Sequence, residues 1–370
     1  MNGQWMGQYT GSSPGSIIVN LDDMGDHYEG SAFLINTDKQ LPGVVAVLKT
    51  NDKTRNFKFK TSIIFAIDPR TNLINTWDNV KQLYPGVIFS KEAEVSGDWD
   101  EKRLVLSWST NQGITGSATL PKSKAGKPSE QKPLIHGWDH YKKHVSSLES
   151  RRYLFRGQNA PWRLRTNFHR SGRAELGRFL TQDIQTLHKH LSARTKHIFN
   201  LAIADENGAF FNLVQHHGYP TPLLDWTYSP YVAAFFAFWH ISNSDAAKAK
   251  VGQKVRIFVF DQKRWREDFN QPLLLNAVSP YFSIIEPLAI DNERMIPQQA
   301  ASSVTNIDDI ESYIKSKEST EKKYLYVIDL SVKERKKVIR ELSCMGITAG
   351  ALFPGLDGAC EELKERFFEV

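Results

Sequence analysis

A change of pattern at residues 122–133 constrains the fold of this chain more than any other feature of its sequence. Before that segment, short runs of alternating apolar and polar residues recur, as at residues 16–21 and 43–48, and such runs predict β-strands. After it, apolar residues also recur at helical spacing. The segment itself is rich in Lys, Ser and Pro, which is typical of a linker. We therefore expect two domains, at residues 1–121 and 134–370, and an α+β fold class.

The first 121 residues are expected to form one small antiparallel β module. Turn residues such as those at 22–26 separate the strand-like runs, and strands at this spacing predict a barrel or a sandwich. Residues 3–11 and 113–118 have the pattern of the first and last strands of a closed or nearly closed sheet. The module contains no group of residues with catalytic chemistry, so we expect it to bind a partner or a target.

Composition excludes several classes of protein. Hydrophobic residues make up 41% of the 370 residues and charged residues 24%, which is globular composition and not that of a disordered chain. No apolar run reaches the roughly 18 residues that a membrane-spanning helix needs, and the N-terminus lacks the pattern of a secretory signal. The two cysteines, Cys344 and Cys360, predict neither a disulfide framework nor a zinc site. We expect a cytoplasmic protein without a bound metal.

The positive charge of the chain is concentrated in its second part. Residues 1–121 contain 11 basic and 13 acidic residues, a balance of −2. Because the whole chain has a net charge of +6, the remaining residues carry +8. Arginine grips phosphate with two parallel hydrogen bonds, so an arginine-rich segment favours a phosphate-rich ligand or a nucleic acid, and the alternative is a solvated basic face. Between residues 151 and 178 a single acid, Glu175, accompanies eight arginines: Arg151, Arg152, Arg156, Arg163, Arg165, Arg170, Arg173 and Arg178.

The first candidate motif is Arg156-Gly157-Gln158, directly after a short apolar strand at residues 153–155. An arginine at a strand end can turn its guanidinium group into a cleft. The glycine that follows can leave the backbone open to a ligand. The alternative is a surface arginine beside a turn.

The second candidate motif covers residues 215–230, in which prolines and a glycine stiffen the chain. Asp225, Thr227 and Ser229 alternate, so an extended backbone places them on one face. A strongly apolar helix is expected at residues 232–241. Ser229 before a proline is also an ideal N-cap for that helix, and we expect both roles at this residue. The third candidate, residues 292–299, would alone be a polar loop.

Together these segments resemble the FRG domain family. The resemblance covers about residues 134–370 and does not extend to residues 1–121. It rests on the following segments: residues 155–158, residues 215–230 with the helix at 233–237, residues 294–299 and residues 352–358.

A second resemblance is to ADP-ribosyltransferases of the arginine–serine–glutamate type. Those enzymes have a strand arginine in a Tyr-Arg-Gly setting, then a Ser/Thr-x-Ser strand that leads into an Ala-x-x-Phe-Ala helix, then a glutamate. Residues 154–157, 227–229 and 233–237 follow that order. The departure is at the glutamate, because Gln298 and Gln299 stand where a Gln-x-Glu is expected. Glu286 and Glu293 are the nearby candidates.

The resemblance implies a split sheet and a reaction with NAD as the substrate. Cleavage of the nicotinamide–ribose bond passes through an oxocarbenium-like transition state, which a carboxylate can stabilise. Asp225 could supply charge there or could brace Arg156. The implied catalytic residues are Arg156, Thr227, Ser229 and Glu293, and the implied NAD-binding residues are Arg156, Gly157, Gln158, Gln215, His216, Asp225 and Gln299.

The expected function is therefore transfer of ADP-ribose from NAD to a macromolecule, with RNA favoured over protein by the basic charge of the second domain. A bacterial toxin or antiphage effector has such an activity, and an antitoxin or another regulatory protein would be its partner. We expect no association with a membrane. Two alternatives stay open: a nucleotide-binding or nucleic-acid-binding module without catalysis, and an NAD glycohydrolase.

Overall fold

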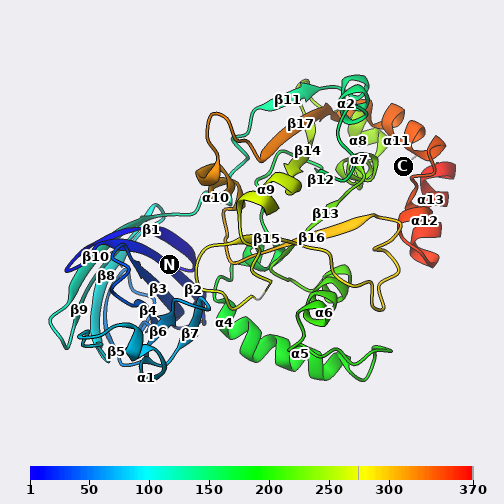
Figure 1. Ribbon diagram of the computed structural model, residues 1–370. Helices are drawn as coiled ribbons and strands as arrows, with labels where there is room; N and C mark the ends of the chain where they lie inside the picture. Colours follow the sequence, from blue (N-terminus) through cyan, green and yellow to red (C-terminus); the bar gives the residue numbers. More distant parts are fainter. Residues whose placement is uncertain (274, 369–370) are drawn as a thin grey trace.

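The computed structural model describes residues 1–273 and 275–368 and contains two large sheets that lie side by side (Figure 1). A ten-stranded sheet uses residues 3–121, and a seven-stranded sheet uses residues 133–331. Helices accompany mainly the second sheet. The expected mixed α+β class is therefore confirmed, while the expected domain end at residue 370 lies outside the described residues.

The ten-stranded sheet is antiparallel throughout, in the order β5-β8-β9-β10-β1-β2-β3-β4-β6-β7. Burial alternates strictly along β10, as expected for a sheet with one buried and one exposed face. Its strands are β1 (Gly3–Gly11), β2 (Gly15–Asp23), β3 (Tyr28–Asn36), β4 (Gly43–Lys49), β5 (Asn56–Thr61), β6 (Ile64–Asp68), β7 (Leu73–Asn75), β8 (Ala93–Trp99), β9 (Arg103–Thr110) and β10 (Thr115–Pro121), with α1 (Trp77–Val80) and the turn η1 (Lys81–Leu83) between β7 and β8.

The sheet is curled but is not a closed barrel. β1 pairs with β10, as expected from their sequences, with Tyr9 opposite Ala118. This pair lies inside the strand order, and the edge strands β5 and β7 do not pair with each other in the described residues. The reason is a corner at residues 62–63, where the chain leaves β5, the partner of β8, and enters β6, the partner of β4. The chain thus passes from the edge strand β5 to β6, which lies next to the other edge strand, and no ladder joins β5 to β6 among the described residues.

The seven-stranded sheet divides into two lobes. Its order is β11-β17-β14-β12-β13-β16-β15, and β11 and β17 form its parallel pair. β12 and β13 pair at a single position, Phe155 with Thr227, whereas the neighbouring pairs extend over four to seven positions. The strands are β11 (Pro133–His136), β12 (Tyr153–Gln158), β13 (Leu223–Thr227), β14 (Lys254–Asp261), β15 (Phe282–Ile285), β16 (Ala300–Thr305) and β17 (Leu325–Ser331).

Successive side chains of β12 point to opposite faces of the sheet and belong to two different hydrophobic cores. Phe155 packs against α7 (Pro230–Phe238), the apolar helix expected after Ser229, whereas Leu154 packs with Trp226 and Phe260. The other helical elements of this part are α2 (Trp138–Val145), α3 (Asn167–Arg170), α4 (Leu176–Arg178), η2 (Phe179–Asp183), α5 (Ile184–Leu191), α6 (Ala204–His216), α8 (Asn243–Lys248), α9 (Gln262–Asp268), α10 (Ile310–Lys317), η3 (Val332–Glu334), α11 (Arg335–Cys344), α12 (Ala349–Leu352) and α13 (Leu356–Phe368).

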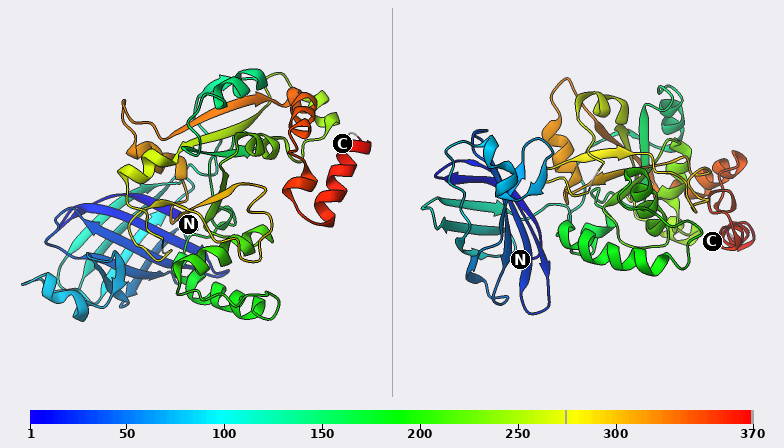
Figure 2. Two further views of the ribbon diagram at one scale, coloured as in Figure 1. Left: turned by 45° about the vertical axis from the view of Figure 1, so that its right-hand side comes forward. Right: turned by 60° about the horizontal axis from the view of Figure 1, so that its bottom comes forward.

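The ten-stranded sheet is in direct contact with connecting segments of the second part of the chain, and Figure 2 shows it against the segments that contain α4 and β15. Asp22 of β2 accepts hydrogen bonds from Arg173 Nε at 3.0 Å and from the backbone amides of Ala174 and Glu175 at 2.8 and 3.1 Å. Gln4 of β1 donates to the carbonyl oxygen of Asn306 at 2.7 Å. The 122–133 segment touches the second sheet region as well, through Ser129 and Glu311, and its susceptibility to proteolysis stays a prediction.

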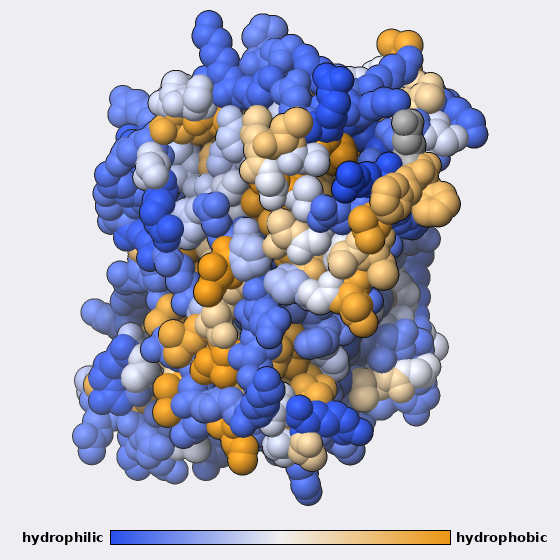
Figure 3. All heavy atoms as spheres, turned by 90° about the vertical axis from the view of Figure 1, so that its right-hand side faces the viewer, coloured by the Kyte–Doolittle hydropathy of each residue, from blue (hydrophilic) through white to orange (hydrophobic). Residues whose placement is uncertain are grey.

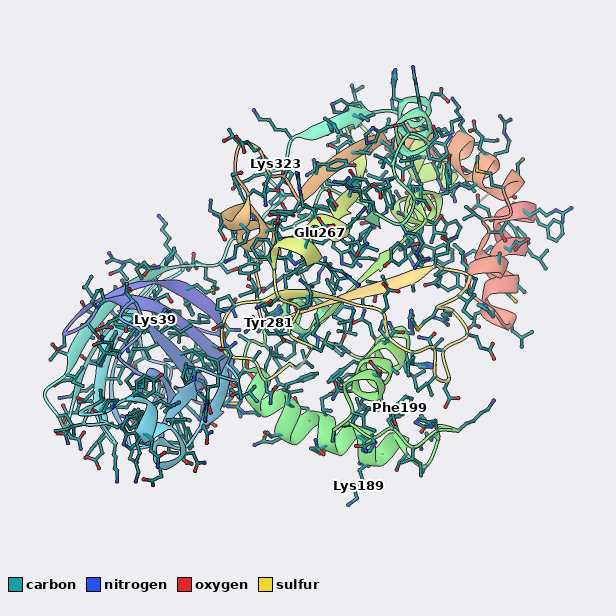
Figure 4. The ribbon with its side chains drawn as sticks, in the orientation of Figure 1. Lys39, Lys189, Phe199, Glu267, Tyr281 and Lys323 are labelled. Atoms are coloured by element: carbon teal, nitrogen blue, oxygen red, sulfur yellow. The ribbon has the colours of Figure 1, made fainter. Side chains whose placement is uncertain are left out.

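The opposite side of the molecule carries the C-terminal helices, and Figure 3 shows apolar patches among hydrophilic side chains on that face. Exposed apolar residues of α13 include Leu356 and Phe367. By contrast, Phe199 and Tyr281 belong to a buried hydrophobic core that also contains residues of α5 and α6. Lys189 extends from α5 away from the protein (Figure 4). Within residues 1–273 and 275–368, no helix has the length and apolar character needed to cross a membrane.

Asp22 should be a major source of stability for the contact between the two sheets. Its carboxylate side chain is 4% exposed, so Asp22→Ala would leave the backbone amides of Ala174 and Glu175 without their acceptor and would remove one carboxylate from Arg173. We expect the free energy of unfolding in urea to fall by about 3 kcal/mol. The neighbouring Asp23 forms an exposed pair with Lys53, and Asp23→Ala should cost less than about 1 kcal/mol. Equal losses in the two variants would contradict this role of Asp22.

Glu175 should make the same contact sensitive to pH. Burial raises the pKa of its carboxyl group to about 7, against a smaller opposing effect of the hydrogen bond from the amide of Gly177. As the pH rises from about 4.5 to 7, the unfolded chain loses a proton that the folded chain keeps, so stability falls by about 3 kcal/mol in total. Urea unfolding of Glu175→Gln should therefore show a smaller loss of stability between pH 5 and pH 8 than the wild type shows. An unchanged loss would mean that the carboxyl group ionises as in the unfolded chain.

Candidate functional site

Arg156 lies at the junction of the two lobes of the seven-stranded sheet. Its Nη1 donates to the carbonyl oxygen of Asp225 at 2.6 Å, two residues from the single pair that joins β12 to β13. Its Nε is buried and has no hydrogen-bond partner among the described residues. Burial lowers the pKa of the guanidinium group to about 10, Asp225 opposes this shift, and Arg170 adds to it. The arginine therefore remains charged at neutral pH and keeps one unused donor in the interior.

Gly157 has a packing role that the sequence did not reveal. A Cβ atom at this position would lie 1.9 Å from the carbonyl oxygen of Ala233 and 2.5 Å from the amide nitrogen of Ala237, both in α7. The glycine thus allows α7 to pack directly on β12, and on this side its backbone is covered by the helix and not open to a ligand. The adjacent Gln158 is buried and donates to the carbonyl oxygen of Trp162 at 2.7 Å.

The side chain of Asp225 is held by the beginning of its own motif. Gln215, in the last turn of α6, donates through Nε2 to Asp225 Oδ1, and Thr221 donates to Gln215 Oε1. Residues 215–230 therefore fold back so that the helix end, the loop and β13 are linked by side chains. Asp225 is partly exposed; its carboxylate accepts from Gln215, while its backbone carbonyl oxygen accepts from Arg156.

The third motif contacts the same helix end. Asn292 donates through Nδ2 to Asn212 Oδ1 at 2.6 Å and lies 2.5 Å from His216 Nδ1. Burial lowers the pKa of His216, so the ring is neutral and Nδ1 acts as the acceptor, an assignment that follows from the hydrogen bonds. The sequence prediction did not select Asn212, although Asn212 and His216 are four residues apart and share one face of a helix.

Residues 298–299 close over the end of β13. Thr227 Oγ1 donates to the carbonyl oxygen of Gln298 at 2.7 Å. The backbone amide of Tyr228 donates to the carbonyl oxygen of Gln299 at 3.0 Å. Ser229 accepts from the amide of Val232, which makes it the N-cap of α7, as expected. Gln298 Nε2 in turn donates to the carbonyl oxygen of Leu352 at 2.9 Å. All the sequence motifs, including residues 352–358, are thus connected around β13.

The two candidate glutamates have surface positions. Glu293 is exposed. Glu286 accepts from the hydroxyl group of Tyr228 at 2.7 Å and forms ion pairs with Arg266 and Arg151. Neither makes a hydrogen bond to Arg156, Thr227 or Ser229 within residues 1–273 and 275–368. The carboxylate that belongs to the junction is therefore that of Asp225.

The eight arginines of residues 151–178 are largely engaged within the protein. Six form ion pairs with carboxylates, and the other two, Arg156 and Arg170, donate to backbone carbonyl oxygens. Several of these carboxylates are distant in sequence, as in the pairs Arg152–Asp261 and Arg165–Asp308. The segment is therefore an internal network and not a free basic face. The remaining pairs are Arg151–Glu286, Arg163–Asp309, Arg173–Asp22 and Arg178–Glu29.

Comparison with known proteins identifies one family. Residues 151–246 match the family model of the FRG domain, a range that includes Arg156 and the whole 215–230 motif. No curated protein matches the chain. Among solved structures, a redesigned beta barrel, mFAP1, bound to DFHBI covers 33% of this chain and 94% of its own length, at 11% identity and a TM-score of 0.23, a value too low for any statement about the fold.

Replacement of Gly157 tests its packing role. In Gly157→Ala the new methyl group would meet backbone atoms of α7, so the helix must move away from β12. We expect the free energy of unfolding to fall by at least about 2 kcal/mol, measured by urea denaturation. In the control, Gly126→Ala, no atom lies within 4 Å of the added Cβ, and the change should stay below about 1 kcal/mol. A wild-type stability of Gly157→Ala would show that α7 does not need this close approach.

Proposed function

We propose that this chain, whose residues 151–246 form an FRG domain, binds NAD at the junction of the two sheet lobes and transfers ADP-ribose from it to a macromolecule. The observation that carries the proposal is the convergence at one junction of an arginine, a Thr-x-Ser strand end and a carboxylate. Arg156 and Asp225 are 69 residues apart in sequence, and Arg156 Nη1 donates there to the backbone carbonyl oxygen of Asp225.

The fold supports the proposal through the division of the sheet. A sheet that opens beside a strand arginine is the arrangement that the resemblance to ADP-ribosyltransferases implies. Here the lobes join at Phe155 and Thr227. The arginine lies on one strand and Thr227, which leads into the Ser229 cap, lies on the other. A nucleotide could contact both lobes at such an opening.

The chemistry assigns a role to each group. The bond between nicotinamide and ribose C1′ breaks, nicotinamide leaves with the electron pair, and an acceptor nucleophile bonds to C1′ as it loses its proton. Arg156, whose guanidinium group uses Nη1 in its side-chain hydrogen bond within the described residues, would hold a phosphate of NAD. Asp225 would stabilise the positive charge that develops on the ribose ring. Thr227 and Ser229 would keep the strand end in position.

RNA is the proposed acceptor because the second part of the chain is basic. Six of the eight arginines that suggested a nucleic acid form ion pairs with carboxylates of the protein. The preference for RNA therefore rests on the net charge of +8 beyond residue 121. Transfer to RNA would be toxic to the cell that makes the protein. This fits a bacterial toxin or antiphage effector that works in the cytoplasm and is held inactive by an antitoxin or another regulatory protein.

A second candidate function, nucleotide binding without catalysis, is favoured by the glutamine in the late motif. Gln298 stands near the position where a transferase of this type has its glutamate, is buried, and donates to a backbone carbonyl group instead. A site with Arg156 but without a dedicated glutamate would bind a nucleotide and leave it intact.

The decisive experiment is incubation of the purified full chain with NAD labelled on its adenylate phosphate, together with separate pools of RNA, DNA and protein. Label in the RNA pool supports the proposal. Label in the protein pool retains the activity and changes the acceptor. Release of free ADP-ribose in every pool would establish an NAD glycohydrolase, and bound but intact NAD would establish the nucleotide-binding function.

Arg156→Lys separates a role in binding phosphate from a role in folding. Lysine keeps the positive charge but loses the planar fork of donors. We expect kcat/KM for NAD to fall about a hundredfold, with a melting temperature close to that of the wild type. Arg151→Lys, an arginine whose side chain is 66% exposed, is the control and should keep wild-type kcat/KM. Full activity of Arg156→Lys would remove Arg156 from the site.

A further inference from the structure

The curled ten-stranded sheet surrounds a cavity of about 160 Å³. Residues from both halves of the sheet line it, including Tyr9 of β1, Leu34 of β3, Ala46 of β4 and Leu106 of β9, together with residues 87–90. None of the residues assigned to the FRG site belongs to this lining. An inference about this cavity is therefore independent of the proposed function.

The lining sets the charge and size of a ligand. It contains no Lys, Arg, Asp, Glu or His, so a charged group in the cavity would lose its hydration without a compensating partner. An engineered apolar cavity of about 150 Å³ is known to bind benzene. A ligand of this cavity should accordingly be neutral and contain one aromatic ring or a small fused pair.

Two aromatic side chains form one wall. The rings of Tyr9 and Trp108 have centroids 5.5 Å apart at an angle of 63°. A glycine lies behind each ring: a Cβ on Gly15 would be 2.7 Å from the Tyr9 hydroxyl oxygen, and one on Gly116 would be 2.2 Å from Trp108. The rings are thus seated closely on the sheet, and their edges and faces favour an aromatic partner.

The polar end of the cavity has a defined hydrogen-bonding direction. The hydroxyl groups of Tyr9 and Ser13 both donate to Asn36 Oδ1, at 2.6 and 2.7 Å. Asn36 Nδ2 donates to the carbonyl oxygen of Pro42 at 2.7 Å. Because each hydroxyl group has a single proton, both hydroxyl oxygens can now only accept. A ligand that completes this network must therefore donate a hydrogen bond.

The cavity also has a route to solvent. Ile88 and Ile114 belong to its lining and are 69% and 40% exposed. Both lie in connecting segments and not in strands, so a small displacement of these segments would admit a ligand without breaking the ladders of the sheet.

From these observations we propose that the N-terminal sheet binds a small neutral aromatic molecule with one hydrogen-bond donor, of the phenol or indole type. The ring lies against Tyr9 and Trp108, and its O–H or N–H group donates to the hydroxyl oxygens of Tyr9 and Ser13. The N-terminal module is then a ligand-binding domain attached to the FRG domain.

The test is calorimetric titration of the full chain with phenol and, separately, with benzene. Phenol should bind more tightly than benzene to the wild type. Tyr9→Phe removes one acceptor and should weaken phenol binding about tenfold while leaving benzene binding unchanged. In the matched control, Tyr28→Phe, the hydroxyl group is outside the cavity lining, and phenol binding should stay as in the wild type.

A second variant tests the location. Ala46→Phe places a ring inside the cavity and should abolish binding of both compounds, with its folding checked by circular dichroism; if it does not fold, Ala32→Leu at another lining position takes its place. Absence of phenol binding up to its solubility would overturn the proposal. Phenol binding that survives a folded cavity-filling variant would also overturn it, as would equal affinities for phenol and benzene in the wild type.

Discussion

The hydrogen bond from Arg156 to the carbonyl oxygen of Asp225 connects two sheet lobes that otherwise pair at a single position. Where two strands diverge, backbone carbonyl groups lose their ladder partners, and a buried carbonyl without a partner is costly. The long arginine side chain reaches across the opening and supplies the missing donor. The hydrogen bond therefore stabilises the divided sheet and fixes the guanidinium group at the junction, and the candidate site exists because of this arrangement.

The polar network around β13 explains why motifs that are far apart in sequence occur together. Gln215 fixes Asp225, Asn292 fixes the end of α6, and Gln298 links the end of β13 to Leu352. Each of these side chains is an amide, which can donate and accept at once and carries no charge that burial would penalise. Neutral bridging groups suit a site that already contains the charged side chains of Arg156, Arg170, Arg294 and Asp225.

Side-chain patterns over a few residues were enough to predict several elements of the fold. The alternation in residues 1–121, the apolar helix after Ser229 and the N-cap itself follow from side-chain patterns over a few residues. Long-range partners did not follow from them. The arginine-rich segment appeared to be a basic face because Asp22, Asp261 and Asp308, which neutralise it, lie about 100 to 150 residues away. Closure of the first sheet did not follow from the sequence for a similar reason, since two residues at 62–63 separate β5, which pairs with β8, from β6, which pairs with β4.

The contact between Asp22 and the segment that begins at Arg173 also has an evolutionary consequence. Gene fusion can exchange domains freely only when their surfaces are independent of each other. Here the segment that matches the FRG model places Arg173 and Arg178 against carboxylates of the N-terminal sheet, and the backbone amide of Asp308 donates a hydrogen bond to Gln4 Oε1 of that sheet. A new N-terminal module would have to provide the same acceptors at the same positions. We therefore expect the two halves of this chain to be inherited as a matched pair, with compensating sets of substitutions at their contact.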